Sequence, residues 1–218
     1  MADAGHGAAI KAVIFDFDGT LSNSGDWFLT VVNDLARRFR FREVDDDEIE
    51  MLRHRPSREV IAYLGIPRWK LPLISRHVRR LVARNVDQIP LFPGTADLLA
   101  GVGALGYRMG LVTSNAANNA RAILGPDNTA RIDAWAAGSS LFGKAPKFRR
   151  VLKQMGLRPE EAISIGDETR DVDAAREVGM RTGAVLWGYA SEDALAATRP
   201  DVLFRTPDDI LRYLAARR

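Results

Sequence analysis

The sequence contains no cysteine, and this absence limits its chemistry at once. Without thiols, the chain has no disulfide bond, no thiolate nucleophile and no zinc-thiolate site. It also lacks a basic N-terminal region followed by a long apolar run, because the run that starts at Ala12 is interrupted by Asp16. The sequence therefore predicts neither a signal peptide nor a membrane span, and a cytoplasmic location is the default expectation.

A large excess of charge of one sign is also missing. The 31 lysines and arginines exceed the 28 aspartates and glutamates by three, which gives a net charge of +3 over 218 residues. Nucleic-acid binding needs a concentrated basic groove with aromatic side chains for stacking, and Trp69 with a few arginines is a weak case for one. We expect neither nucleic acid nor a membrane as partner, and the oligomeric state stays open.

Most of the basic clustering that is present lies between Arg68 and Arg84. Apolar residues recur there at helical spacing, which predicts an amphipathic helix with a basic face. Such a face is ordinarily solvated, and the alternative is a face that attracts an anionic substrate or partner. The predicted apolar stripe consists of Leu73, Ile74, His77, Val78, Leu81 and Val82, opposite Arg76, Arg79, Arg80 and Arg84.

The order of periodic segments predicts the fold class. Hydrophobic residues make up 46% of the chain, enough for one large or two small domains. Helices are expected over 27–39, 46–53, 57–64 and 71–85, then over 95–105, 118–124, 147–155, 171–178, 192–197 and 208–216. Short buried strands are expected over 12–15, 108–113, 162–165, 181–185 and 202–204. Strands that alternate with helices imply an α/β protein with a doubly wound parallel sheet.

The first helical block interrupts this pattern. Residues 1–23 and 89–218 make up the predicted α/β core, and residues 24–88 are helical throughout. We expect this insertion to form a separate small domain that is joined to the core by two loops.

The most informative segment is KAVIFDFDGTL, from Lys11 to Leu21. Residues i and i+2 of an extended chain point the same way, so Asp16 and Asp18 face one volume at the carboxyl end of a buried strand. Two such acids repel each other unless a cation lies between them, and a carboxylate-rich site without cysteine suits Mg²⁺. The alternative is an Asp-Gly turn that closes a hairpin, which the preceding buried strand disfavours.

Further polar residues follow the later strands. Ser114 lies at a strand-to-helix turn that can hold a phosphate oxygen, although Ser-Asn is equally a helix N-cap. Lys144 precedes a helix and can neutralise a carboxylate and a phosphoryl oxygen, although most such lysines are surface residues. Asp167 and Asp171 are four residues apart, which makes them neighbours at the start of a helix, and one metal fits between Asp16 and Asp167.

In this order, the four signals DxDGT, Ser/Thr, Lys and GDxxxD resemble the haloacid dehalogenase superfamily of phosphohydrolases over nearly the whole chain. The resemblance implies that residues 24–88 are a C1 cap domain and that the cofactor is Mg²⁺. It implies that Asp16 is the nucleophile, Asp18 the general acid/base and Thr20 the residue that steadies Asp18. The implied set is Asp16, Asp18 and Lys144 for catalysis, Thr20, Ser114 and Asn115 for substrate, and Asp16, Asp18, Asp167 and Asp171 for metal.

Finer details are similar to the phosphoglycolate phosphatase branch, among them Gly179-Met180 and the segment from Val185 to Tyr189. Two positions depart from the branch pattern. Asn23 stands where an aspartate is common, and the third motif reads Lys144-Ala145-Pro146-Lys147, so either lysine can carry the role. We favour Lys144, because Gly143 allows a close approach of the loop, and we expect Lys147 to point away from the crevice.

The expected function is therefore Mg²⁺-dependent hydrolysis of a small phosphorylated metabolite, with phosphoglycolate as a candidate. A phosphomutase and a sugar-phosphate phosphatase are the alternatives within the superfamily, and a non-catalytic phosphoacceptor signalling module is the alternative outside it. Asp18 disfavours a C–Cl dehalogenase, which needs no acid for an alkoxide. Four residues of the insertion are candidates to reach a substrate anion, with solvated helix ends as the alternative: Arg53, His54, Arg55 and Arg58.

Overall fold

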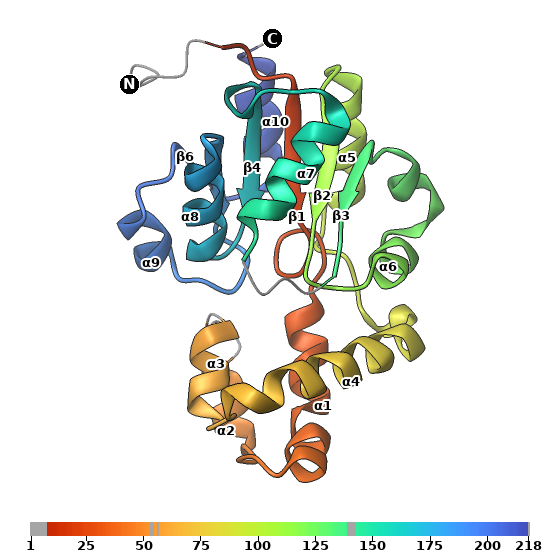
Figure 1. Cartoon of the computed structure of the whole chain (residues 1–218), viewed down its shortest axis with the longest axis vertical. Helices are drawn as coiled ribbons and strands as arrows, with labels where there is room; N and C mark the ends of the chain where they lie inside the picture. Colours follow the sequence, from red (N-terminus) through yellow and green to blue (C-terminus); the bar gives the residue numbers. More distant parts are fainter. Residues whose placement is uncertain (1–7, 53–54, 56, 139–142, 218) are drawn as a thin grey trace.

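A computed structural model describes residues 8–52, 55, 57–138 and 143–217, and shows an α/β core beside a group of helices (Figure 1). The described strands form one six-stranded parallel sheet in the order β3-β2-β1-β4-β5-β6. They are β1 (Ala12–Asp16), β2 (Arg108–Val112), β3 (Ala134–Ala136), β4 (Ala162–Gly166), β5 (Arg181–Val185) and β6 (Val202–Phe204). The predicted doubly wound α/β class is confirmed.

Strand β1 lies at the centre of this sheet. It pairs with β2, where Asp16 is opposite Val112, and with β4, where Phe15 is opposite Ile165. The chain continues outward through β2 and β3 on one side of β1 and through β4, β5 and β6 on the other. The carboxyl ends of β1 and β4 therefore form the point at which the strand order reverses, where open α/β sheets bind their ligands.

Helices cover both faces of the sheet (Figure 1). The helices of the core are α5 (Thr95–Ala104), α6 (Ala117–Ala130), α7 (Ala145–Met155), α8 (Thr169–Val178), α9 (Glu192–Ala197) and α10 (Pro207–Ala215), with a 3-10 turn at Pro159–Glu161. Apolar side chains of α5, α6 and α10 cluster with one face, and those of α7 and α8 cluster with the other. Each face of the sheet is buried, as expected of parallel strands.

Side chains alternate between the two faces of the sheet along β1, and this alternation determines the face on which its last residue, Asp16, lies. Val13 and Phe15 belong to the apolar cluster of α5 and α10, whereas Ala12 and Ile14 belong to the cluster of α7 and α8. Asp16 follows Ile14 by two residues, so it shares the face of α7 and α8. The carboxylate therefore meets residues at the first turns of these two helices.

The helical insert, residues 24–88, lies at the carboxyl ends of the strands (Figure 1). It contains α1 (Ser24–Phe39), α2 (Asp46–Leu52), α3 (Ser57–Tyr63) and α4 (Leu71–Arg84), with 3-10 turns at Arg68–Lys70 and Val86–Gln88. Its helices surround an apolar cluster of their own, to which Val32, Leu52 and Leu64 belong. Within the described residues, no helix is long and apolar enough to cross a membrane.

The observed elements differ from the predicted ones at three places. Strand β3 was not predicted, because its sequence Ala-Trp-Ala is too short to show a period. Helix α6 ends its first segment at Leu124, as predicted, because Gly125 has a φ of 76° and a ψ of 167° that are not helical, and a second helical segment that was not predicted runs on to Ala130. On α4, the predicted stripe is buried or half-buried except at Leu73, whose side chain is 58% exposed, and Arg79 of the predicted basic face lines a cavity.

Candidate active site

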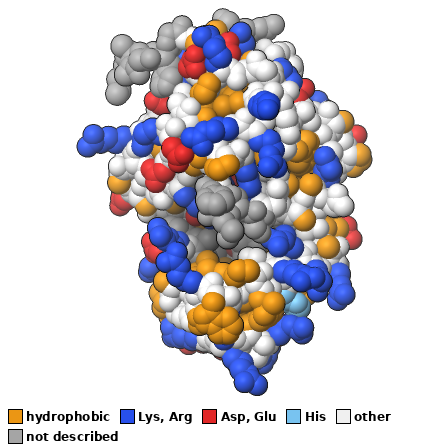
Figure 2. All heavy atoms as spheres, in the orientation of Figure 1, with side chains coloured by type: hydrophobic (Ala, Val, Ile, Leu, Met, Phe, Trp, Pro, Cys, Tyr) orange, Lys and Arg blue, Asp and Glu red, His pale blue; other side chains and the backbone are white. Residues whose placement is uncertain are grey.

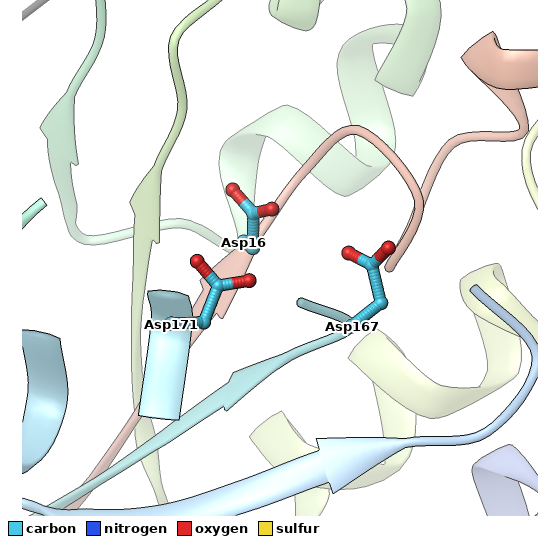
Figure 3. A group of neighbouring side chains, drawn as sticks. All are labelled: Asp16, Asp167 and Asp171. Carbon is cyan, nitrogen blue, oxygen red and sulfur yellow. The ribbon is translucent and has the colours of Figure 1, made fainter. Parts of the chain in front are cut away.

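Three buried carboxylates meet at the reversal point of the sheet. Asp16 ends β1, Asp167 follows β4, and Asp171 lies in the first turn of α8. One carboxylate oxygen from each lies within 4.8 Å of the others, and Figure 3 shows the three side chains together at the strand ends. The structure therefore brings together three of the four residues that the sequence predicted as metal ligands.

The backbone leaves room for Asp167 on two sides. Gly19 has a φ of +88°, and a Cβ atom placed on it would collide with the carboxylate of Asp167. A Cβ atom on Gly188 would collide with the same side chain. These two glycines let the loops after β1 and β5 close around a buried acid, which larger residues would displace.

Two donors hold the carboxylate of Asp167. The Thr20 hydroxyl donates to Oδ1 at 2.9 Å, and the Tyr189 backbone N–H donates to Oδ2 at 3.0 Å. Thr20 was expected to steady Asp18 and to bind substrate, so this contact is a correction. Thr20 is fully buried in the turn after β1, where its side chain reaches toward β4. The hydroxyl therefore orients a predicted metal ligand.

Burial and mutual repulsion shift the pKa values of Asp16 and Asp167. Burial raises the pKa of Asp16 to about 7, against the opposing charge of Lys144. Burial and the nearby charge of Asp16 also raise the pKa of Asp167 well above its usual range. A divalent cation would relieve this repulsion, and an all-carboxylate set without sulfur is the donor set that Mg²⁺ takes. The residues present therefore fit the expected ion.

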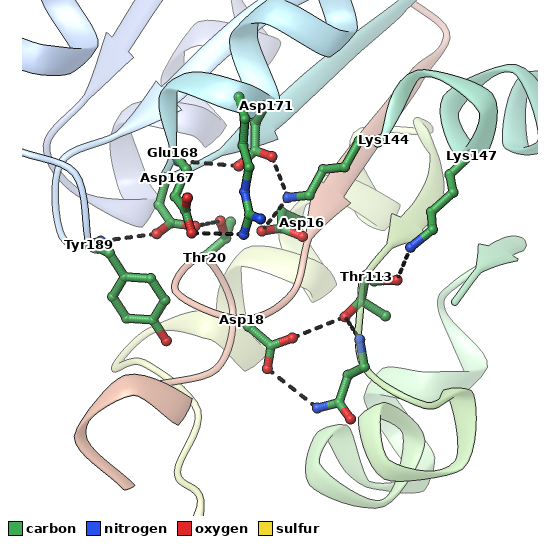
Figure 4. Close-up of polar contacts among 12 residues, drawn as sticks. Asp16, Asp18, Thr20, Thr113, Lys144, Lys147, Asp167, Glu168, Asp171 and Tyr189 are labelled. Atoms are coloured by element: carbon green, nitrogen blue, oxygen red, sulfur yellow. Dashed lines mark hydrogen bonds and ion pairs between the residues drawn. The ribbon is translucent and has the colours of Figure 1, made fainter. Parts of the chain in front are cut away.

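Lys144 completes the cluster. It is the N-cap residue of α7, and its Nζ lies 2.7 Å from Oδ2 of Asp16 and forms a second ion pair with Asp171 (Figure 4). Burial opposes the charge of the ammonium group, but Asp16 and Asp171 outweigh it and raise the pKa of Lys144. The ammonium group stays charged beside the predicted nucleophile, as the third motif requires.

Lys147 does not point away from the crevice, which corrects our expectation. Its side chain is 8% exposed, and Nζ donates to the carbonyl oxygens of Thr113, at 2.6 Å, and of Gly138. Helix α7 begins at Ala145, so Lys147 lies in the first turn, beside the ends of β2 and β3. Burial and the charge of Lys144 lower its pKa to about 8. Lys147 thus ties two loops together, whereas Lys144 contacts the acids.

Asp18 lies apart from the acid cluster, and three side chains hold its carboxylate. Thr113 donates to it at 3.0 Å (Figure 4), Ser24 donates to it at 2.9 Å, and the Asn115 amide lies 3.4 Å away. Asn115 lines the cavity and stays a predicted substrate ligand, and its amide also contacts Asp18 and the start of α6. Ser114, between the two donors of this loop, is exposed and stays a predicted phosphate ligand.

A cavity of about 420 Å³ joins these groups to the helical insert. Asp16, Asp18, Ser114 and Lys144 line its polar end, so the two aspartates do open on one volume. Figure 2 shows a hollow between the core and the insert, with lysines and arginines on both sides of it.

The arginines of the insert divide into two groups. Arg55 lines the cavity, whereas Arg58, an exposed residue of α3, is not among the lining residues. Arg58 therefore does not contact the cavity in this structure. Arg53 and His54 lie outside the described residues.

Three contacts of the site were missed from the sequence. Thr113 directly precedes Ser114, so the polar run after β2 was a usable signal for it. The contacts of Ser24 with Asp18 and of Tyr189 with Asp167 join distant segments, and no local pattern indicates them. These residues hold the two acids that the motifs identified.

Comparison with known proteins agrees with this geometry. The chain matches the haloacid dehalogenase-like hydrolase family over residues 13–185, and it belongs to that family. The phosphoglycolate phosphatase of Synechococcus elongatus is 33% identical over 204 residues, which cover 93% of this chain and 96% of the relative. The chain is therefore an enzyme, a phosphatase of the haloacid dehalogenase type.

Two further matches extend the comparison. A solved structure of a haloacid dehalogenase-like family hydrolase from Streptococcus pneumoniae aligns with a TM-score of 0.79 and 25% identity, covering 94% of this chain and 98% of that chain. A Mycobacterium tuberculosis protein named tyrosine-protein kinase PtkA is 28% identical over 201 residues, which cover 90% of this chain and 69% of the relative. Proteins similar to this chain are thus named both as hydrolases and as a kinase.

Proposed function

We propose that the chain is a Mg²⁺-dependent phosphomonoester hydrolase that acts on a small phosphorylated metabolite through an aspartyl-phosphate at Asp16. One observation carries this proposal: a buried carboxylate in contact with Lys144 opens on the same cavity as a second carboxylate, Asp18, that is held by three side chains. The arrangement supplies a nucleophile and a separate acid/base to one substrate.

In the first step, a carboxylate oxygen of Asp16 attacks phosphorus and the bond to the leaving oxygen breaks. The Lys144 ammonium, 2.7 Å from Asp16, stabilises negative charge on the phosphoryl oxygens. Ser114 would bind one of these oxygens, and its exposure at the polar end of the cavity supports this role.

Asp18 moves the protons. Its protonated carboxyl gives a proton to the leaving alkoxide, and the resulting carboxylate takes one from the water that hydrolyses the aspartyl-phosphate. Ser24, Thr113 and Asn115 fix the direction of this carboxyl, so the same group serves both steps.

Asp16, Asp167 and Asp171 are the residues that would hold Mg²⁺. When bound, the ion supplies positive charge that lets an anionic nucleophile approach an anionic phosphate. Thr20 and Tyr189 orient Asp167 for this role.

We propose phosphoglycolate as the first metabolite to test, because the relative from Synechococcus elongatus is named a phosphoglycolate phosphatase. One relative is named a tyrosine-protein kinase, and a kinase transfers the phosphoryl group to a protein side chain instead of to water. The acceptor of the phosphoryl group therefore also has to be tested. We propose water as the acceptor, because Asp18 lies within reach of the same cavity that the substrate enters.

The test is a screen of phosphorylated metabolites for release of inorganic phosphate, with Mg²⁺ and with a chelator. We expect phosphate release that requires Mg²⁺ and is absent from the matched variant Asp16→Asn. Undiminished release in the chelator would contradict the role of the metal. Transfer to an added alcohol or tyrosine peptide without release of phosphate would contradict water as the acceptor.

A further inference from the structure

We infer that the preferred substrate is a phosphomonoester with an apolar leaving group, an alkyl or aryl group larger than glycolate, and that the helical insert holds this group. This inference rests on the proposed function and adds the chemical class of the substrate. It comes from the walls of the cavity that the acids open on.

The wall of this cavity that the insert provides is mostly apolar. Phe28 and Leu29 contribute from α1, Val60 and Ile61 from α3, and Ile74 and Val78 from α4. Leu29, Val60 and Ile74 belong to the apolar cluster of the insert, so the cavity reaches that cluster. A substrate group that enters this far from the phosphate contacts hydrocarbon on three helices.

The cavity also contains guanidinium groups, but they already have partners. Arg55 pairs with Glu59 at 3.2 Å, and Arg170 pairs with Glu168 at 2.8 Å. Arg79, the third arginine of the lining, also has an interaction partner. A carboxylate on the leaving group would share these cations with the acids that they already contact, whereas an alkyl group needs no cation.

Size leads to the same conclusion. The cavity of about 420 Å³ lies in the range of roughly 300–1,000 Å³ that is typical of pockets for drug-sized ligands. Glycolate has only two carbons and would leave most of the apolar wall in contact with water. A longer alkyl group removes that wall from water, and each added methylene strengthens binding by about fourfold.

The experiment compares kcat/KM for ethyl, butyl and hexyl phosphate with kcat/KM for phosphoglycolate. We expect an increase of about fourfold per methylene, hence roughly 200-fold from ethyl to hexyl phosphate. We also expect hexyl phosphate to exceed phosphoglycolate. A flat alkyl series, or a preference for phosphoglycolate, would overturn the inference and leave phosphomonoester hydrolysis standing. If no phosphomonoester is hydrolysed, p-nitrophenyl phosphate included, both proposals fail.

Substitutions in the apolar wall of the cavity test whether this wall causes the preference for longer alkyl groups. Val78→Phe narrows the cavity, and Ile61→Gln makes its wall polar, so each should reduce the ratio of kcat/KM for hexyl to ethyl phosphate by at least tenfold. Leu73→Phe is the matched control, because Leu73 lies on the same helix as Val78, is 58% exposed and is not a lining residue. This variant should keep the wild-type ratio. An unchanged ratio in both wall variants, or an equal loss in the control, would contradict the inference.

Discussion

The two ends of the cavity are built on opposite physical principles. At the strand ends, Asp16, Asp167 and Asp171 are buried side by side, and their charges repel. In the helical insert, the buried residues are apolar, and ion pairs such as that of Arg37 with Glu43 lie at the surface. Among the described residues, the buried charges therefore lie in the core, where the proposed phosphoryl transfer needs them, and burying like charges together costs stability.

The largest effect is expected from a substitution that changes only the charged end of the cavity, at the strand ends. Asp16→Asn keeps the shape of the side chain but replaces the nucleophile with an amide, so turnover should fall by roughly 10⁴-fold or more. Circular dichroism should show an unchanged fold. Full Mg²⁺-dependent phosphate release by this variant would remove Asp16 from the nucleophilic role.

Asp18→Asn should reduce turnover of an alkyl phosphate by roughly 10²- to 10⁴-fold, because the leaving alkoxide no longer receives a proton. The first step with p-nitrophenyl phosphate should be affected much less, since p-nitrophenolate leaves without an acid. Burst measurements of p-nitrophenolate separate the two steps. Equal losses in the first step with both substrates would count against the acid/base assignment.

The two lysines offer a matched pair. Lys144→Met removes the ammonium group beside Asp16, and we expect kcat to fall by roughly 10²- to 10³-fold. Lys147→Met leaves the carbonyl oxygens of Thr113 and Gly138 without their donor. It should mainly lower the free energy of unfolding, by roughly 1–3 kcal/mol, with a smaller loss of kcat. Steady-state kinetics and urea unfolding measure the two effects, and the reverse order would reassign the third motif to Lys147.

The smallest expected effect concerns stability and pH. Because the pKa of Asp16 is raised to about 7, the native state binds this proton more tightly than the unfolded state does. The stability linked to this proton is therefore greatest at acid pH and is lost as the pH rises through about 7. Mg²⁺ needs the carboxylates deprotonated, so it should raise the Tm by several degrees at pH 8 and by less at pH 5.5.

Thermal unfolding at these two pH values, with and without Mg²⁺, provides this measurement. Asp167→Asn is the control and should reduce the response to Mg²⁺, because it removes one carboxylate of the cluster. A Tm increase that is larger at pH 5.5 would contradict the proposed competition between protons and metal.

Local patterns predicted most of the charged end. A short apolar run before DxDGT fixes β1, and the face of a strand is a property of residue spacing, so the placement of Asp16 followed from the sequence. Lys144 and Asp171 belong to motifs at the starts of helices, and their meeting with Asp16 follows from the fold class. These placements depend on short segments whose strand and helix states are clear.

The rest depends on tertiary contacts. The hydroxyl of Thr20 contacts Asp167 instead of Asp18 because β4 pairs with β1. The local sequence around Thr20 does not show which of the two acids its hydroxyl contacts. Strand β3 exists because β2 provides an edge for three residues. The exposure of Leu73 at the border of the α4 stripe and the position of Arg79 at the cavity depend on packing in the insert, which helical period alone does not determine.

The most direct test of this account is to trap the phosphoryl group on the protein. Asp18→Asn would be mixed with p-nitrophenyl phosphate and Mg²⁺, quenched in acid within milliseconds, digested and analysed by mass spectrometry. The account predicts one phosphoryl group on the peptide that contains Asp16, with none in the double variant Asp16→Asn/Asp18→Asn. A phosphoryl group on any other residue, or rapid phosphate release without a labelled peptide, would contradict it.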